Sequence, residues 1–127
     1  NIAVWLERIP ANKRTSWDHA HSVEEEFIFV LEGNPIVRLN NNEFRAKPFT
    51  GIDFKAGAGV SHTLFNDSEE FIYYLCAGEC EPLNDKIYYP NHPSRNVDMK
   101  KEGALWEEMV ARSAQADLKK KTILWQK

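Results

Sequence analysis

Cysteine, histidine and long apolar runs are all scarce in this chain of 127 residues. It has 2 cysteines and 4 histidines, and no apolar run approaches the roughly 20 residues that a transmembrane helix needs. Cys76 and Cys80 stand in a C-x-x-x-C arrangement, which is the spacing neither of a redox C-x-x-C pair nor of a usual zinc pair. We therefore expect a protein without a membrane span, in which Cys76 is a small buried residue, Cys80 lies on a turn, and no disulfide bond is needed.

Excess positive charge is missing as well. The formal net charge is -3 and the isoelectric point is near 5.8, so nothing in the composition favours binding to nucleic acid. No secretory signal is visible, and we expect a cytoplasmic protein. The first residue is Asn1 rather than Met, which leaves N-terminal targeting open.

Internal repeats and low-complexity segments are absent, and the length suits one domain with its own core. Short apolar runs alternate with Gly, Pro and Asn clusters over most of the chain, which predicts an all-β architecture. Beyond the loop 90–94 the apolar spacing changes to three and four residues, which predicts a helix; the residues that carry this pattern are Leu105, Trp106, Met109, Val110 and Leu118. We therefore predict a β-domain over residues 1–90, followed over 91–127 by a loop and a helix that packs on this domain or on a partner subunit.

Three of the histidines stand at spacings that favour a common site. Residues two apart in a strand share a face, so His19 and His21 would project together from an extended segment over residues 15–21. Glu26 lies at an odd offset from His21, so a turn or bulge around residues 22–24 must change the direction of the chain before Glu26 starts the next strand. His62 begins a later apolar run behind a glycine-containing corner.

Three imidazoles and one carboxylate make a ligand set for one divalent transition metal ion. Imidazole suits Zn, Fe, Cu and Ni, and the carboxylate extends the choice toward Mn. We expect one such ion per subunit on His19, His21, Glu26 and His62, and the sequence does not distinguish Fe, Mn, Zn and Ni. The alternative is a site that is empty or that holds only an organic ligand.

The other polar and aromatic residues near these motifs have simpler interpretations. Glu24 and Glu25 read as solvated charges, and Asn66 as a residue that holds a turn. His92 has no partner at a useful spacing and reads as a loop residue. Trp17 belongs either to the wall of a cavity or to the core.

The spacing of these residues resembles the two motifs of the cupin superfamily. The first motif is matched by His19, His21, Glu26 and Gly33, although Lys13 stands where its leading glycine would be. The second is matched by Gly51, Gly59, His62 and Asn66, with Gly57 in place of its proline. The resemblance extends from about Val4 to Tyr89. It implies a cupin-type double-stranded β-helix, a jelly-roll barrel with a C-terminal helical segment, and all four metal-ligand positions of the family are intact.

Two classes of function agree with this pattern. In the first, the chain is a metal-dependent enzyme with oxygenase- or isomerase-like chemistry on a small organic substrate, because the ligand set leaves coordination positions open. In the second, it is a non-catalytic module that binds or senses a small ligand, or that holds a structural metal. A structural site is usually closed by four protein ligands on a tetrahedral ion, and fold analogy does not decide between the two.

A homodimer is the assembly we expect. The edges of a small β-domain need covering, and two-fold dimers are the commonest oligomers. The chain also carries large apolar residues beyond what one such domain should absorb, namely Trp5, Leu105, Trp106 and Trp125. The alternative is that the C-terminal helix folds back and buries these residues within one subunit.

Overall fold

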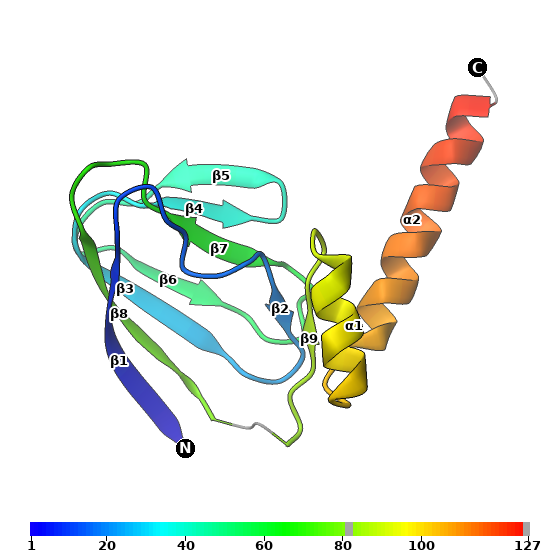
Figure 1. The fold of residues 1–127 in the computed structure, drawn as a ribbon, viewed down its shortest axis with the longest axis horizontal. Helices are drawn as coiled ribbons and strands as arrows, with labels where there is room; N and C mark the ends of the chain where they lie inside the picture. The colour runs from blue at the N-terminus through cyan, green and yellow to red at the C-terminus, as the bar shows by residue number, and fades with distance from the viewer. Residues whose placement is uncertain (81–82, 126–127) are drawn as a thin grey trace.

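The computed structural model describes residues 1–80 and 83–125, and only the backbone of residues 117–125. In these residues β-strands come first and two helices follow (Figure 1). The strands are β1 (Ile2–Ile9), β2 (Ala20–His21), β3 (Glu26–Glu32), β4 (Ile36–Leu39), β5 (Asn42–Arg45), β6 (Gly51–Phe54), β7 (His62–Phe65), β8 (Ile72–Glu79) and β9 (Ile87–Tyr88). The helices are α1 (Pro93–Lys101) and α2 (Glu107–Trp125).

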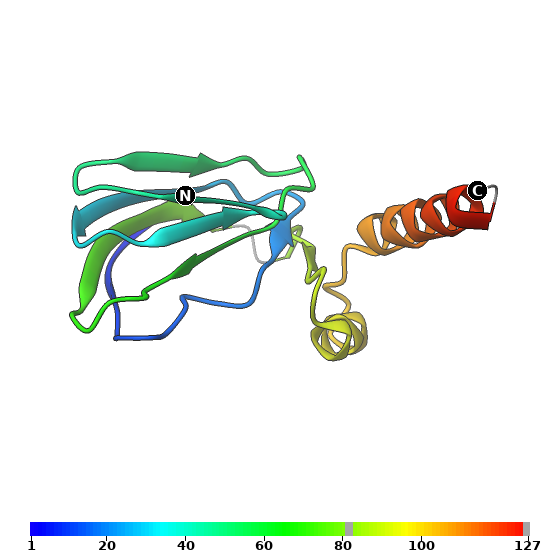
Figure 2. The same ribbon diagram turned by 90° about the horizontal axis from the view of Figure 1, so that it is seen from above.

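The strands form two larger sheets and one short antiparallel pair. The first sheet has the order β1-β8-β3-β6, the second has the order β5-β4-β7, and β2 pairs with β9. The two larger sheets lie one over the other (Figure 2). The described strands do not close into one continuous barrel, so the predicted barrel is present as facing sheets.

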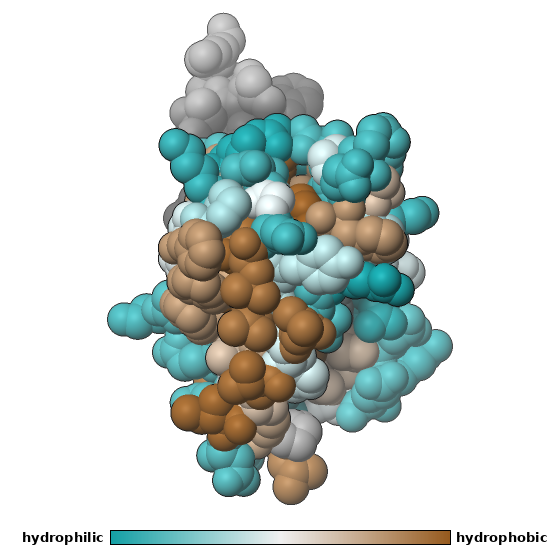
Figure 3. Space-filling model, turned by 90° about the vertical axis from the view of Figure 1, so that its left-hand side faces the viewer, coloured by the Kyte–Doolittle hydropathy of each residue, from teal (hydrophilic) through white to brown (hydrophobic). Residues whose placement is uncertain are grey.

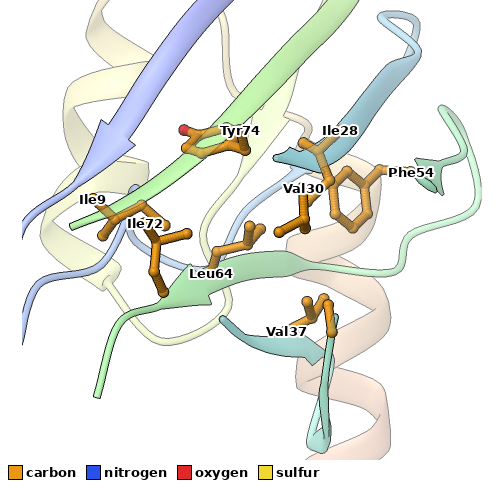
Figure 4. Packing of buried hydrophobic residues seen from close by; sticks show 9 residues of the cluster. Ile9, Ile28, Val30, Val37, Phe54, Leu64, Ile72 and Tyr74 are labelled. Atoms are coloured by element: carbon orange, nitrogen blue, oxygen red, sulfur yellow. The ribbon is translucent and has the colours of Figure 1, made fainter. Parts of the chain in front are cut away.

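The core lies between these two sheets (Figure 4). Ile28 and Val30 of β3 point inward and are buried, whereas Phe27, which precedes Ile28, is exposed on the outer face. This alternation follows from the two-residue period of a strand. Val37 of β4 and Leu64 of β7 supply the opposite wall of the core. Glu26 lies two residues before Ile28 in the same strand and therefore shares its face, so the carboxylate of Glu26 also faces the interior.

The segment from Arg14 to His21 differs from the predicted continuous strand. It meets β7 through isolated bridges at Arg14 and His19, and only Ala20–His21 forms a regular strand. Side-chain hydrogen bonds compete here with strand pairing, since the Oγ atoms of Ser16 and Thr15 both make local or cross-segment contacts. The extended prediction for residues 15–18 was therefore wrong, although the two histidines still converge.

The predicted single helix is two helices. Gly103, with φ of 71°, interrupts the helical path, and Leu105 makes a parallel bridge to Ile87 of β9. Leu105 and Trp106 therefore lie in the link between α1 and α2 and not within a helix, and Leu118 has no described side chain. Both helices lie next to β9, and α2 projects away from the sheets (Figure 1). Neither described helix is long and apolar enough to cross a membrane.

Candidate metal centre

The structure brings the four predicted ligand residues together. Measured to Oε2 of Glu26, the Nε2 atoms of His19, His21 and His62 lie at 3.7, 3.5 and 2.7 Å respectively. The His19 and His62 rings are 4.6 Å apart between centroids, and the His19 and His21 rings are 4.9 Å apart. All four side chains are at least half-buried.

Local backbone pairing explains this convergence. His19 and His62 exchange two backbone hydrogen bonds, of 3.2 and 2.9 Å, across an antiparallel bridge. After His21 the chain bends at Ser22 and Val23, as the odd offset to Glu26 required. Glu26 then begins β3, and its side chain points between the sheets toward the imidazoles.

The donor atoms of His19, His21 and Glu26 lie close enough to one another to hold one ion, and Nε2 of His62, outside that group, approaches the same carboxylate oxygen to 2.7 Å. Oε2 of Glu26 is buried and accepts no hydrogen bond of acceptable geometry, even though His62 Nε2 is close. Two ligand atoms that are each about 2.1 Å from one ion are about 3.0 Å apart at a right angle and about 3.4 Å apart at the tetrahedral angle. The observed N···O separations of 2.7 to 3.7 Å bracket these values. A buried carboxylate oxygen without a hydrogen-bond partner calls for an explanation, and a cation held between it and the ring nitrogens supplies one.

Other contacts of the rings leave Nε2 free to act as the ligand atom. Nδ1 of His19 lies 2.8 Å from the carbonyl oxygen of Trp17, which can only accept a hydrogen bond. Nδ1 of His21 lies 2.5 Å from Oδ2 of Asp85. If each Nδ1 carries the proton and donates it, each Nε2 presents a lone pair to the centre. His62 is fixed differently, because its ring stacks on Phe54 with a centroid distance of 3.8 Å and an interplanar angle of 2°.

The electrostatics of the cluster keep its carboxylate ionised and shift the pKa values of two of its imidazoles in opposite directions. Burial acts to raise the pKa of Glu26, but the neighbouring imidazoles of His19 and His62 outweigh burial and hold this pKa well below its usual range. Burial acts to lower the pKa of His19, but Glu26 and the Trp17 carbonyl reverse the effect and raise it. Burial lowers the pKa of His62, and the opposing effect of Glu26 does not restore it. At neutral pH the cluster therefore holds an ionised carboxylate beside a neutral His62.

A cavity of about 170 Å³ adjoins this cluster. It reaches into the space between the sheets and is lined by Thr15, Ser16, His19, Glu26, Ile28, Phe54, His62, Leu64, Tyr74 and Cys76. Burial raises the pKa of the Cys76 thiol to about 11, so the thiol is protonated at neutral pH in the metal-free protein. Cys76 and Cys80 are both free, and Cys76 is half-buried rather than buried as predicted.

Asp85 is the residue of this region that sequence reasoning missed. Its side chain is 6% exposed and contacts His21 from 64 positions further along the chain. No motif spacing connects the two residues. The sequence held only a weak indication of this role for Asp85, namely that an acidic residue stands just before a short apolar run at Ile87.

Three residues with simpler predicted roles can also be placed. Asn66 is buried and holds a turn, since it donates to the carbonyls of Ile9 and Glu70, as predicted. His92 lies in the loop before α1, and the centroid of its ring is 3.9 Å from that of the Trp17 ring. Trp17 is partly exposed and lines neither the core nor this cavity.

The predicted solvated glutamates are both half-buried. Oε2 of Glu24 lies 4.0 Å from Nδ1 of His21, and Glu25 accepts a hydrogen bond from the backbone amide of Ala56. His21, Glu24 and Asp85 are close enough together to form a second candidate metal-binding group, beside the group of His19, His21 and Glu26.

Comparison with known proteins gives the family. The chain has 27% sequence identity to a protein assigned as a sugar phosphate isomerase from Acidithiobacillus ferrooxidans, with a TM-score of 0.68 over 72% of this chain and 57% of that one. It has 26% identity to a sugar phosphate isomerase of the cupin superfamily from Silicibacter pomeroyi, with a TM-score of 0.66 over 69% of this chain and 55% of that one. The chain thus spans a little over half the length of these two proteins.

A more distant structure shares the fold alone. The salicylate 1,2-dioxygenase from Pseudaminobacter salicylatoxidans is 14% identical, with a TM-score of 0.61 over 69% of this chain and 26% of that one. No curated protein matches the chain. The model of the cupin domain matches residues 5–78, which is more than half of the sequence and includes all four histidine and glutamate positions of the centre. The chain belongs to the cupin family.

Proposed function

We propose that the chain binds one divalent transition metal ion through His19, His21, Glu26 and His62, and that it is a metal-dependent enzyme acting on a small organic substrate. The observation that carries the proposal is the buried Oε2 of Glu26, which faces three Nε2 atoms and accepts no hydrogen bond. Fe, Mn, Zn and Ni all accept such a ligand set.

The chain's own residues have distinct roles in this proposal. A metal ion bound here would supply Lewis-acid or redox chemistry at its open coordination positions. Glu26 contributes the negative charge that offsets the cation, and the Trp17 carbonyl orients the His19 ring through Nδ1. Phe54 holds the plane of His62. Ile28 and Leu64 make the adjoining cavity partly apolar, which limits the access of water.

The cavity restricts the class of substrate. Its volume of about 170 Å³ is below the roughly 300–1,000 Å³ of pockets that hold drug-sized ligands. No Lys or Arg is among its lining residues. Two arginines of the strands are engaged elsewhere, since Arg8 lies over the ring of Phe71 and Arg38 pairs with Asp18 and Glu43. The described residues thus favour a small substrate without a phosphate group, which differs from the sugar phosphates named for two similar structures.

Metal content tests this proposal. The protein purified without added metal, then loaded with Zn²⁺ or Mn²⁺ and desalted, should retain about one ion per chain by elemental analysis. The double variant His21→Ala/His62→Ala should retain none, because only two ligands remain. His92→Ala is the matched control, since His92 lies outside the centre, and it should retain one ion. Stoichiometric metal in the double variant would refute the assignment.

Turnover separates an enzyme from a binding module. The metal-loaded protein is incubated with small hydroxy, keto and phenolic compounds, with and without dioxygen, and products are followed by mass spectrometry. Metal-dependent product formation that is absent from the double variant supports the enzyme. Saturable binding of the same compounds without any product would instead favour the ligand-binding alternative.

The finer architecture is part of the same proposal. We propose that the two facing sheets are the halves of a jelly-roll barrel over residues 1–90, with residues 91–127 as an accessory segment. A cytoplasmic location and a homodimeric assembly also stay proposals.

A further inference from the structure

Asp85 is a buried carboxylate outside the four proposed ligands, and donors surround both of its oxygens. Oδ2 lies 2.5 Å from Nδ1 of His21. Oδ1 accepts hydrogen bonds from the backbone amides of Val23 and Glu24, at 2.9 and 3.2 Å, and lies 3.4 Å from the Ser22 hydroxyl. The carboxylate therefore joins the His21 ring to the bend that leads toward Glu26.

These contacts fix the orientation of the carboxylate and the tautomer of the ring. Backbone amides can only donate, so Oδ1 must be an acceptor. Oδ2 of the ionised group must also accept, and the one atom that can donate to it from the ring is a protonated Nδ1. Nε2 of His21 then presents its lone pair toward Glu26, 3.5 Å away.

We propose that Asp85 is a positioning residue that holds His21 in the Nδ1-protonated tautomer and directs Nε2 into the metal centre. The inference rests on the metal binding proposed above and goes beyond it, because Asp85 lies outside the residues 5–78 that the family model matches. Carboxylates in this position commonly orient metal-binding imidazoles and make them more basic.

The segment from Asp85 to Asn91 runs alongside the segment that carries His19 and His21. β9 pairs with β2, so that Tyr88 lies opposite Ala20 and Ile87 opposite His21. Further along, Nδ2 of Asn91 donates to Oδ2 of the buried Asp18, at 2.8 Å. Residues 85–91 thus hold the segment that carries His19 and His21 from the side away from β7.

A competing interpretation is that Asp85 is itself a metal ligand, in a second group with His21 and Glu24. Two observations argue against it. Oδ1 of Asp85 is already engaged by two backbone amides, and Oε2 of Glu24 is 4.0 Å from the ring nitrogen that Asp85 approaches to 2.5 Å. The geometry is that of a hydrogen bond between Asp85 and His21, with Glu24 beside it.

The test compares Asp85→Asn with Glu24→Gln, which removes the neighbouring charge as a matched control. An amide at position 85 must present its NH₂ group either to the backbone amides or to Nδ1 of His21, and both arrangements disturb the ring. We expect Zn²⁺ affinity, measured by competition with a chromophoric chelator, to fall about 10- to 100-fold in Asp85→Asn. Stoichiometry at saturating Zn²⁺ should stay at about one ion, and Glu24→Gln should change the affinity less than threefold.

Ring nitrogen NMR of the metal-free protein gives a readout that a merely structural role would not move. Wild type should show His21 protonated at Nδ1, whereas folded Asp85→Asn should show a shift toward Nε2 protonation. An Nε2-protonated His21 in wild type would overturn the proposal even if the variant does not fold. Loss of a second bound ion in both variants would overturn it in favour of a second metal group.

The two proposals can fail separately. If wild type binds no metal, the proposed function fails, while the NMR comparison still decides whether Asp85 sets the tautomer. If metal binds but neither affinity nor tautomer changes in Asp85→Asn, the positioning role is wrong and the metal centre stands.

Discussion

At the scale of single residues, His19 and His62 occupy one cluster but have pKa values shifted in opposite directions. The pKa of His19 is raised and that of His62 is lowered. Because imidazole must be neutral to bind a metal ion, the proton of His19 competes with the metal up to a higher pH than the proton of His62 does.

Metal affinity should therefore increase with pH through the usual histidine range near 6.5 and continue to increase above it. In the metal-free protein the raised pKa of His19 adds stability below pH 6.5, and this contribution is lost as pH rises through the raised value. Stabilisation by a bound metal ion instead increases with pH, because the metal binds more tightly when His19 is neutral. The increase in Tm on adding Zn²⁺ should therefore be larger at pH 8 than at pH 6. Dissociation constants at four pH values from 5.5 to 8.5 check this, and an affinity that does not change over this range would contradict it.

Fixed spacings in the sequence predicted which residues lie together, whereas their role as metal ligands stays a prediction. His19, His21, Glu26 and His62 came from strand periodicity and two motifs, and the structure places them together. Asp85 could not be found in this way, because its contact with His21 depends on where the chain runs after β8. No local pattern encodes that path.

At the scale of elements, the corner between β3 and β4 depends on Gly33. Its φ is 88°, and a Cβ atom added there would lie 2.6 Å from Cγ1 of the buried Ile72. Gly103, between α1 and α2, has a similar φ of 71° but has nothing within 4 Å of such an atom. Both glycines therefore adopt a left-handed backbone conformation, but only Gly33 is packed against a neighbouring side chain.

Gly33→Ala should lower the free energy of unfolding more than Gly103→Ala does. Left-handed backbone costs a residue with a Cβ about 1–2 kcal/mol at either position. Forcing an atom against Ile72 adds about 1–3 kcal/mol at Gly33 alone. Urea unfolding of both variants checks this, and equal losses would show that Ile72 moves aside without cost.

The elements themselves were predicted where turn residues bounded a strand. The strands Ile36–Leu39 and His62–Phe65 coincide with two of the short apolar runs of the sequence. The predicted C-terminal helical segment is present, but apolar spacing does not register that Leu105 pairs its backbone with Ile87, so the division into two helices was not predicted. A tertiary contact interrupts the helix, and Gly103 supplies the conformation that the interruption needs.

At the scale of the whole molecule, the outer face of the β1-β8-β3-β6 sheet carries an unusual amount of apolar surface. Val4 and Leu6 of the edge strand β1 are 63% and 67% exposed, and Phe27 of β3 is 43% exposed. Val4 and Phe27 flank Ala77 of β8 on the same cross-strand row. On the side of the molecule that carries β1, apolar residues gather in one patch (Figure 3).

The residues that first suggested a dimer contribute less than this face. Trp5 of β1 is 45% exposed, whereas Leu105 and Trp106 are half-buried in the link between the helices. The side chain of Trp125 lies outside the described residues. The case for a dimer therefore rests on the outer sheet face and the free edge of β1, and we propose that a second copy of the chain covers them.

Val4→Glu/Leu6→Glu should convert the dimer into a monomer. Both side chains are exposed in the single chain, so the charges add no burial cost to folding, but two copies would bring like charges into a desolvated interface. Light scattering at micromolar concentration should give about twice 14.7 kDa for wild type and about 14.7 kDa for the variant. Val97→Glu on α1 is the control, because Val97 is similarly exposed at 53% but lies on a different element, and its mass should equal that of wild type. A wild-type mass near 14.7 kDa would exclude the dimer, whereas a dimeric double variant would place the interface on another surface.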